Sequence, residues 1–299
     1  IGGVIPGILL IVVVAGWGIQ GYLWGSIVSA AVWVFVYWLV LAPGSGTGLE
    51  FSRLGPSLKY SLPLWPHLLF TWAITFADRL VLERLVPLSE VGIYGIGYQL
   101  ASVVPVVTFA VINAWLPGYF RSGDSHTGRL DYLRVLSVFT TLIALMVLAI
   151  YVLAPEVVRW VTAPGFEGST RILQIVAIGV AYHAVFQAMI LVLFYEKAGP
   201  QISIGTGLSL AVNLLGLAIL VPKFGIIGAA WATVLAFASA TIYSLIRAWK
   251  LLKVPMTAVC WSVAPVIVGT AMLSVLGVVD TQAQAWSGRV SVAVVAGTV

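Results

Sequence analysis

The sequence predicts an all-α protein built as a polytopic bundle of transmembrane helices. Of its 299 residues, 61% are hydrophobic and only 8% are charged, whereas about a quarter of the residues in a soluble domain are charged. The apolar runs are long and continuous, unlike the weakly alternating strands of an outer-membrane barrel. Since about 20 apolar residues cross a bilayer once, the chain is long enough for roughly ten helices.

Short polar or Gly/Pro-containing stretches separate the apolar segments and define the expected helices in order. We expect helices at residues 1–17, 22–42, 60–82, 91–118, 132–154, 172–195, 201–221, 226–247 and 257–279, and then a run at 290–299 that is too short to span. The connections are brief throughout, so no extramembrane domain is expected.

Basic residues are distributed unequally between alternate connections. Of the 15 Lys and Arg residues, nine fall on one side and five on the other, and Arg79 lies within a predicted span. The positive-inside rule places the side with nine in the cytoplasm. The formal net charge of +5 is therefore read as membrane topology, and no nucleic-acid partner is expected.

Residues that commonly carry catalysis or bind metals are scarce. The chain has one cysteine and three histidines, His67, His126 and His183, which excludes an intramolecular disulfide and gives no metal-ligand spacing. A membrane protease or phosphatase would need a nucleophile with a base, or clustered acids and histidines. We therefore expect no catalytic residue, no metal site and no cofactor.

The segment 60–82 carries a polar stripe. At about 100° per residue, one face holds His67, Thr71, Thr75 and Asp78. A carboxylate in hydrocarbon is costly, so Asp78 is expected to face a protein or water-filled interior. In one interpretation, Asp78 and Arg79 lie near the outer membrane edge. In the other, Asp78 couples to a proton or cation and Arg79 recognises an anion.

Two prolines of the same segment, Pro63 and Pro66, are predicted to break the helix near its basic-side end, as mobile gating helices require. Weaker polar rows follow on later spans: Tyr94, Tyr98 and Ser102 with Gln99 and Asn113; Gly179, His183 and Gln187; and Ser203, Thr206, Ser209 and Asn213. Asn, Gln and Tyr side chains bind sugars or serve as interhelical glue, whereas His183 is either a satisfied core histidine or a titrating group, and these interpretations stay open. Small residues from Gly225 to Ser244, with Thr233 among them, predict close helix packing.

Two stretches resemble a known family. From Leu58 to Phe120, a Pro-bearing helix ends in Asp78-Arg79 and is followed by Val-Gly-Ile-Tyr and Trp-x-Pro. This order resembles the seventh and eighth helices of bacterial polysaccharide flippases in the multidrug/oligosaccharidyl-lipid/polysaccharide exporter superfamily. From Asn213 to Phe237, the Pro-x-x-Gly-x-x-Gly-Ala-Ala turn is similar to the eleventh and twelfth helices of that family.

The resemblance implies a two-lobed exporter fold with the first lobe incomplete. Residues 1–42 would be the last two helices of the first lobe, and 43–59 a cytoplasmic connection. Residues 60–255 would form the second six-helix lobe, and 256–299 additional C-terminal helices, truncated. Basic side chains are scarce in the membrane portion of this lobe, in contrast to the cationic central cavity of the family.

The resemblance also implies a function. Members move undecaprenyl-pyrophosphate-linked oligosaccharide from the cytoplasmic to the periplasmic leaflet of the bacterial inner membrane, by alternating access and for O-antigen-type lipopolysaccharide biosynthesis. Membrane lipids, a glycan polymerase and a chain-length regulator are the implied partners. In such a flippase we expect substrate binding by Arg79, Asn113, Gln99, Tyr98 and Asn213, and gating or ion coupling by Asp78, His183 and Gln187.

Two alternatives remain open at this stage. One is a drug or metabolite antiporter of the same superfamily, which would bind amphipathic cations in a cavity dominated by acids, whereas this chain has a single intramembrane acid, Asp78. The other is a membrane scaffold of a glycan-assembly complex that does not itself transport.

Overall fold

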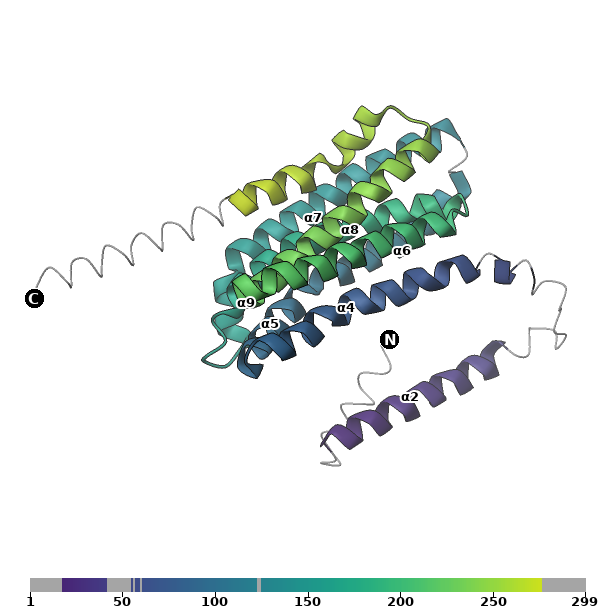
Figure 1. Ribbon diagram of the computed structural model, residues 1–299. Coiled ribbons are helices and arrows are strands. Elements are labelled where there is room, and N and C mark those ends of the chain that lie inside the picture. The colour runs from purple at the N-terminus through teal and green to yellow at the C-terminus, as the bar shows by residue number, and fades with distance from the viewer. Residues whose placement is uncertain (1–17, 42–54, 56, 60, 123–124, 276–299) are drawn as a thin grey trace, which may run out of the picture. The chain divides into compact units, whose positions relative to one another are not determined.

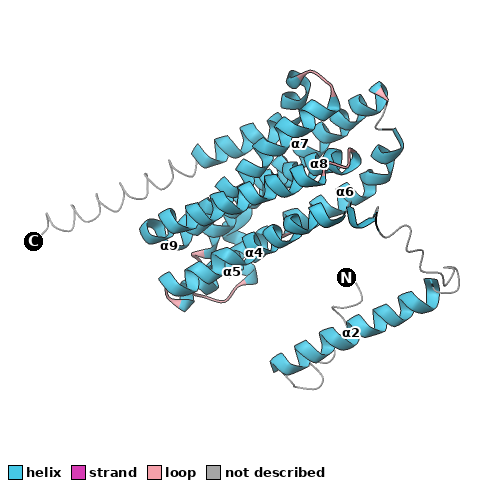
Figure 2. Cartoon of the chain, turned by 45° about the vertical axis from the view of Figure 1, so that its right-hand side comes forward, coloured by secondary structure: helices cyan, strands magenta, loops and turns pink. Residues whose placement is uncertain are grey.

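The computed structural model of the chain describes residues 18–41, 55, 57–59, 61–122 and 125–275, drawn as coloured ribbon in Figure 1. In these ranges the elements are helices joined by short loops, with no strand (Figure 2). The chain separates into two compact units, Ile1–Ser57 and Leu58–Val299. The first contains α2 (Gly18–Leu41), which corresponds to the span predicted at 22–42. The spans predicted at 1–17 and 290–299, and most of the connection at 43–59, lie outside the described residues.

The second unit is a helical bundle. It contains a short 3-10 helix η1 (Leu62–Leu64), followed by α4 (Trp65–Leu85), α5 (Leu88–Ala101), α6 (Val103–Ser122), α7 (His126–Val161), α8 (Ser169–Tyr195), α9 (Gly199–Leu252) and a last helix, Met256–Val275. Five of the described helical segments are long and apolar enough to cross a membrane: Leu88–Arg121, His126–Val161, Ser169–Tyr195, Gly199–Leu252 and Met256–Val275.

The centre of the bundle is α8. Nineteen of its 27 residues are buried, and it packs against α5, α6, α7 and α9. A helix that is hydrophobic all round is stable only where other helices cover every face. The sequence of α8, with apolar residues on all sides, therefore explains its central position.

The 54 residues of α9 form a hairpin of two helical arms. Straight, they would measure about 80 Å, far more than one bilayer. Gly225 interrupts the helix with φ 56° and ψ −135°, a region that glycine adopts without strain. Ser209 of the first arm donates to the carbonyl of Ala236 on the second at 2.8 Å. The two helices predicted at 201–221 and 226–247 are these arms.

The single helix predicted at 91–118 is two helices in the structure, α5 and α6, interrupted at Ser102. Pro105 has no N–H to donate to the carbonyl of Ala101, so the helical bonding pattern fails at this point. The Ser102 hydroxyl donates to the carbonyl of Gln99 at 2.5 Å. The predicted span is present and extends further at both ends, from Leu88 to Ser122, but the break was missed.

The ends of two helices also differ from the predictions. Ser125 caps α7 by accepting from the N–H of Gly128 at 2.9 Å, so this helix begins earlier than residue 132. Pro63 and Pro66 lie where the helical structure is interrupted, because a 3-10 turn separates helical residues 57–59 and 61 from α4. Pro63 lies in η1 and Pro66 in the first turn of α4, where a missing N–H costs no helical hydrogen bond.

Candidate functional site

The polar centre of the second unit is the carboxylate of Asp78. Only 2% of this residue is exposed, although it lies on α4, a helix with just four buried residues out of 21. The span predicted at 60–82 corresponds to α4, yet α4 is absent from the five apolar spans of the described chain. Polar and charged residues, among them His67, Asp78 and Arg79, lower its hydropathy; Asp78 is buried in the protein, whereas Thr71 and Thr75 are exposed.

Three neutral side chains donate hydrogen bonds to Asp78, each from a different helical segment. The hydroxyl of Tyr94 on α5 lies 2.5 Å from Oδ2. The hydroxyl of Thr233, on the second arm of α9, lies 2.8 Å from the same oxygen. The Nδ2 group of Asn213, on the first arm, lies 3.3 Å from Oδ1. We refer to these four residues as the Asp78 cluster.

No ion pair joins Asp78 to Arg79 in the described structure. Adjacent positions of a helix point about 100° apart, so the two side chains leave α4 in different directions. Arg79 is half-buried. The buried carboxylate is therefore satisfied by hydroxyl and amide donors and not by a neighbouring cation.

The cluster lies deep within the bundle. Asn213 is 14 residues after Gly199, the first residue of α9, which is about 21 Å along a helix. The α4 helix runs along α9 in the same direction, since the hydroxyl of Ser203 donates to the carbonyl of Pro63 and Asn213 contacts Asp78 (Figure 1). By this count the cluster lies near the middle of the first arm of α9, which runs from Gly199 to the break at Gly225.

One atom of the cluster has no partner. The Oδ1 atom of Asn213 is buried and accepts no hydrogen bond in the described structure. A carboxylate only accepts, so the amide must turn its Nδ2 group towards Asp78 and its oxygen elsewhere.

A cavity of about 220 Å³ lies beside the cluster. Thr71 and Thr75 of the predicted stripe line it, as do Tyr98 and His183. The Tyr98 ring lies 5.9 Å from the ring of Tyr94, which connects the cavity wall to the cluster. The ring of His183 lies 4.6 Å from that of Phe237, which also lines the cavity.

The other end of the stripe is tied to α9 as well. The Nδ1 atom of His67 lies 2.6 Å from the hydroxyl oxygen of Thr206. The hydroxyls of Thr71 and Thr75 donate to the carbonyls of His67 and Thr71 on their own helix. The shared face predicted for these residues is thus present, with Asp78 and His67 bound to α9 and the two threonines on the cavity.

Three of the expected site residues lie elsewhere. Gln99 and Asn113 are exposed, and the Asn113 amide donates to the carbonyl of Phe109 on its own helix at 2.7 Å. Gln187 is half-buried on α8, one turn beyond His183. None of the three is among the described residues that contact Asp78 or line the cavity.

Sequence reasoning missed two members of the cluster. Tyr94 belonged to a row that was interpreted as binding sugar or as forming interhelical hydrogen bonds. Thr233 belonged to the small-residue stripe that was interpreted as a helix-packing surface. The available signal for Thr233 was a hydroxyl in the middle of a stripe of Ala and Gly whose other hydroxyl residue is Ser244, in a chain with a lone intramembrane acid. In the described ranges, no group of three or more His, Cys, Asp or Glu residues could hold a metal ion.

Comparison with known proteins adds the following. A family model described as Polysaccharide biosynthesis protein matches residues 1–169. The Haemophilus influenzae protein named Lsg locus putative protein 1 is 23% identical over 212 residues, which is 67% of this chain and 53% of that protein. The chain thus spans about half the length of the curated relative that it matches.

Two solved structures share the fold. A mutant of the Vibrio cholerae MATE transporter VcmN has a TM-score of 0.64 at 15% identity, covering 84% of this chain and 60% of that one. The lipid II flippase MurJ, in an inward closed conformation, has a TM-score of 0.59 at 15% identity, covering 93% of this chain and 66% of that one. The predicted all-α polytopic bundle is confirmed.

Proposed function

The chain belongs to the polysaccharide biosynthesis protein family, and we propose that it is part of a flippase. It forms the second lobe of that flippase together with the last two helices of the first lobe. The flippase moves undecaprenyl-pyrophosphate-linked oligosaccharide from the cytoplasmic to the periplasmic leaflet of the bacterial inner membrane by alternating access, without covalent chemistry. Its product feeds O-antigen-type polysaccharide assembly, with a glycan polymerase and a chain-length regulator as partners. The similarity in fold to two membrane transporters supports this proposal.

The observation that carries the mechanism is the buried carboxylate of Asp78, which has three neutral donors and no cationic partner among the described residues. A change of its charge would act on α4, α5 and both arms of α9 at once. In this mechanism a proton or a hard monovalent cation binds at Asp78. The hydroxyl oxygen of Thr233, which already contacts Asp78, is available as a further cation ligand.

Neutralising Asp78 weakens the charge-assisted hydrogen bonds that hold α4 against its neighbours. Since α4 buries only Ile74, Ala77, Asp78 and Leu82, those bonds are a large part of its attachment. Ion binding thereby changes the relative stability of two positions of α4. An ion gradient can drive transport only through such a difference between states.

The remaining expected residues take roles in substrate handling and gating. Arg79, half-buried next to Asp78, would bind the pyrophosphate, because guanidinium pairs well with phosphate. Tyr98 would stack on a sugar, and the exposed amides of Gln99 and Asn113 would bind sugar hydroxyls. His183, on the cavity, and Gln187, one turn away, stay in the gating role. Asn213, expected to bind substrate, is reassigned to the Asp78 cluster because it donates to that carboxylate.

The test replaces Asp78 by Asn in the full-length protein. Asn keeps the shape but cannot take up or release a proton, so surface polysaccharide should be lost while the protein level stays normal. Asp131→Asn is the matched control, because Asp131 is exposed and pairs only with Arg134 on its own helix. Wild-type polysaccharide output from Asp78→Asn would exclude the coupling role.

Arg79→Ala tests the substrate role separately. Loss of the cation should abolish flipping of pyrophosphate-linked glycan in proteoliposomes and leave ion binding to Asp78 intact. Arg84→Ala, an exposed arginine on the same helix, is the control. Equal flipping by both variants would remove Arg79 from the substrate site.

A drug or metabolite antiporter is the second candidate, favoured by the fold similarity to a MATE transporter and by the aromatic cavity beside Asp78. Resistance of a sensitive host to amphipathic cations, lost in Asp78→Asn, would support this function over the flippase. A scaffold that does not transport predicts no flipping by the purified full-length protein in liposomes.

A further inference from the structure

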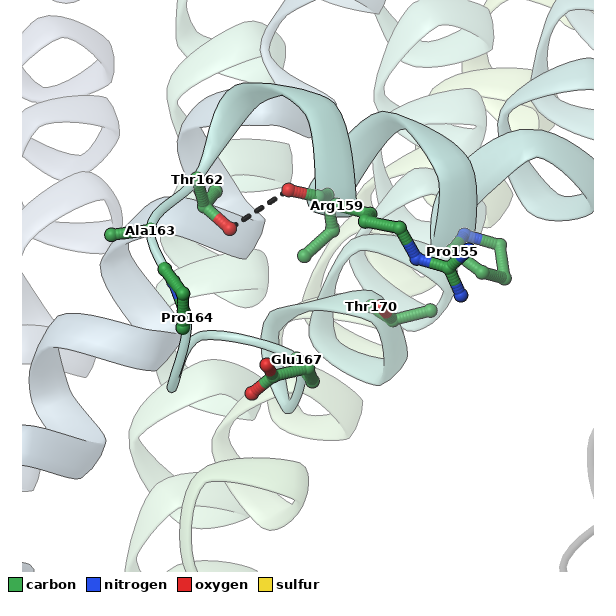
Figure 3. A pocket seen from close by; sticks show the side chains of 8 residues that line it. Pro155, Arg159, Thr162, Ala163, Pro164, Glu167 and Thr170 are labelled. Atoms are coloured by element: carbon green, nitrogen blue, oxygen red, sulfur yellow. Dashed lines mark hydrogen bonds between the residues drawn. The ribbon is translucent and has the colours of Figure 1, made fainter.

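A second pocket, of about 240 Å³, lies where α7 ends and α8 begins. It shares no residue with the Asp78 cluster or the cavity beside it. Figure 3 shows Arg159 from the last turn of α7, Glu167 from the connecting loop, and Thr162 and Thr170 around it. The pocket therefore contains one cation, one anion and two hydroxyls, and no proposed step of transport uses it.

The pocket lies at the depth of lipid head groups. The 20 residues 135–154 of α7 carry no charge and measure about 30 Å as a helix, which is the thickness of the hydrocarbon core. The pocket begins at the next residue, Pro155. Trp160, in the same turn as Arg159, is 85% exposed, and exposed Trp residues favour the head-group region.

The structure around the pocket is firmly held. Pro155 has no N–H for the carbonyl of Tyr151, and the side-chain amide of Gln174 on α8 donates to that carbonyl at 3.0 Å. This bond joins α7 to α8 directly below the pocket. The hydroxyl of Thr162 donates to the carbonyl of Val158 at 2.8 Å, so its lone pairs remain available to accept.

Glu167 is fixed as an ionised carboxylate. The N–H of Gly165 donates to both of its oxygens, at 3.2 Å and 3.1 Å. Gly165 has φ +102°, a conformation that side-chain-bearing residues rarely adopt. Hydrogen bonds from its own backbone amide and from that of Gly165 hold the pKa of Glu167 below its usual value, so the carboxylate stays charged at neutral pH.

Arg159 and Glu167 do not pair with each other in the described structure. A purely anionic ligand would pair with Arg159 and be repelled by Glu167. A purely cationic ligand would pair with Glu167 and be repelled by Arg159. A ligand with a phosphate and an ammonium satisfies both.

We propose that this pocket binds the head group of phosphatidylethanolamine, with its phosphate on Arg159 and its ammonium on Glu167 and the hydroxyl oxygen of Thr162. The ammonium donates hydrogen bonds, which the trimethylammonium of phosphatidylcholine cannot do. The site is independent of the transport cycle proposed above. It anchors the α7–α8 connection to one class of lipid.

The test measures lipid binding to the purified full-length protein by native mass spectrometry. The probes are phosphatidylethanolamine, phosphatidylglycerol and phosphatidylcholine with identical acyl chains. The wild-type protein should retain phosphatidylethanolamine more than the other two, because phosphatidylglycerol has no cation for Glu167 and the cation of phosphatidylcholine donates no hydrogen bond. Glu167→Gln should remove the preference over phosphatidylglycerol, and Arg159→Gln should weaken binding of all three phosphate-bearing lipids.

Two exposed residues provide matched controls. Glu156→Gln makes the same charge change on α7 outside the pocket, and Arg84→Gln does so at the end of α4. Both should bind lipids as the wild type does. A wild-type protein that holds phosphatidylglycerol as well as phosphatidylethanolamine would overturn the proposal, as would a preference that survives in Glu167→Gln.

Discussion

The helices α8 and α4 belong to the same bundle but are held in it differently. Nineteen of the 27 residues of α8 are buried and nearly all are apolar, whereas α4 buries four of 21 and one of these is Asp78. Exposed large apolar side chains such as Leu68, Trp72 and Leu80 cover much of α4. Other helices cover α8 on every side, whereas α4 packs on α9 along one face, where polar contacts add to apolar ones.

Those polar contacts occur at three levels along α4. The Ser203 hydroxyl donates to the carbonyl of Pro63 at 2.5 Å, His67 and Thr206 form the second contact, and the Asp78 cluster is the third. In a membrane, helix association depends on packing and hydrogen bonds rather than on the hydrophobic effect. Polar contacts can be exchanged without opening a void, so α4 is suited to move, and α8 to stay in place.

The largest expected effect tests the packing of α8. A Cβ atom at Gly97 of α5 would lie 2.7 Å from Cβ of Ile172 and 2.9 Å from the carbonyl oxygen of Ser169, both on α8. Neither atom can move without shifting the helix backbone. Gly97→Ala should lower the free energy of unfolding by about 3 kcal/mol, the upper end for an overfilled core, measured by SDS titration in mixed micelles.

Gly95→Ala is the control for that substitution. It lies on the same helix, and its Cβ would meet nothing within 4 Å. Replacing Gly by Ala within a helix stabilises the helix by up to about 1 kcal/mol, so the free energy of unfolding of this variant should be slightly higher. Equal loss of stability in both variants would show that the contact between α5 and α8 is not tight.

An intermediate effect tests the attachment of α4. Tyr94→Phe removes one hydrogen-bond donor to the buried carboxylate of Asp78. It should lower the free energy of unfolding by about 2 kcal/mol, as expected for a hydrogen bond to a charged group. The same SDS titration measures it. Tyr98→Phe is the control, because no hydrogen bond of the Tyr98 hydroxyl is found in the described structure. If the two variants unfold alike, Asp78 does not hold α4 in place.

The sequence predicted the elements whose boundaries are marked by local chemistry. Pro222 and Gly225 marked the turn of the α9 hairpin, and continuous apolar residues marked α8. The break at Ser102 was missed because Pro105 sits within an apolar run, where only the lost hydrogen bond reveals it. The early start of α7 depends on a cap by Ser125, a signal that is weaker than hydrophobicity.

The site was predictable only at its centre. A lone acid on a polar stripe identified Asp78, because burying a carboxylate requires partners. The partners come from positions 16, 135 and 155 residues away along the chain, and a periodicity argument does not reach that far. A polar residue on an apolar helix, such as Asn113, can face either side, and here it is exposed.

The smallest expected effect tests the single contact between His67, near the start of α4, and Thr206. Thr206→Val removes the hydroxyl that contacts His67. It should lower the free energy of unfolding by about 1 kcal/mol, as expected for a neutral hydrogen bond. Its distinctive result is local: amides of the first turns of α4 should exchange with deuterium faster, while those of α8 keep their protection. Thr71→Val is the matched control, because the Thr71 hydroxyl bonds only within its own helix. Faster exchange throughout α8 in Thr206→Val would mean that the two helices open as one unit, and the distinction between a packed helix and a hydrogen-bonded one would fail.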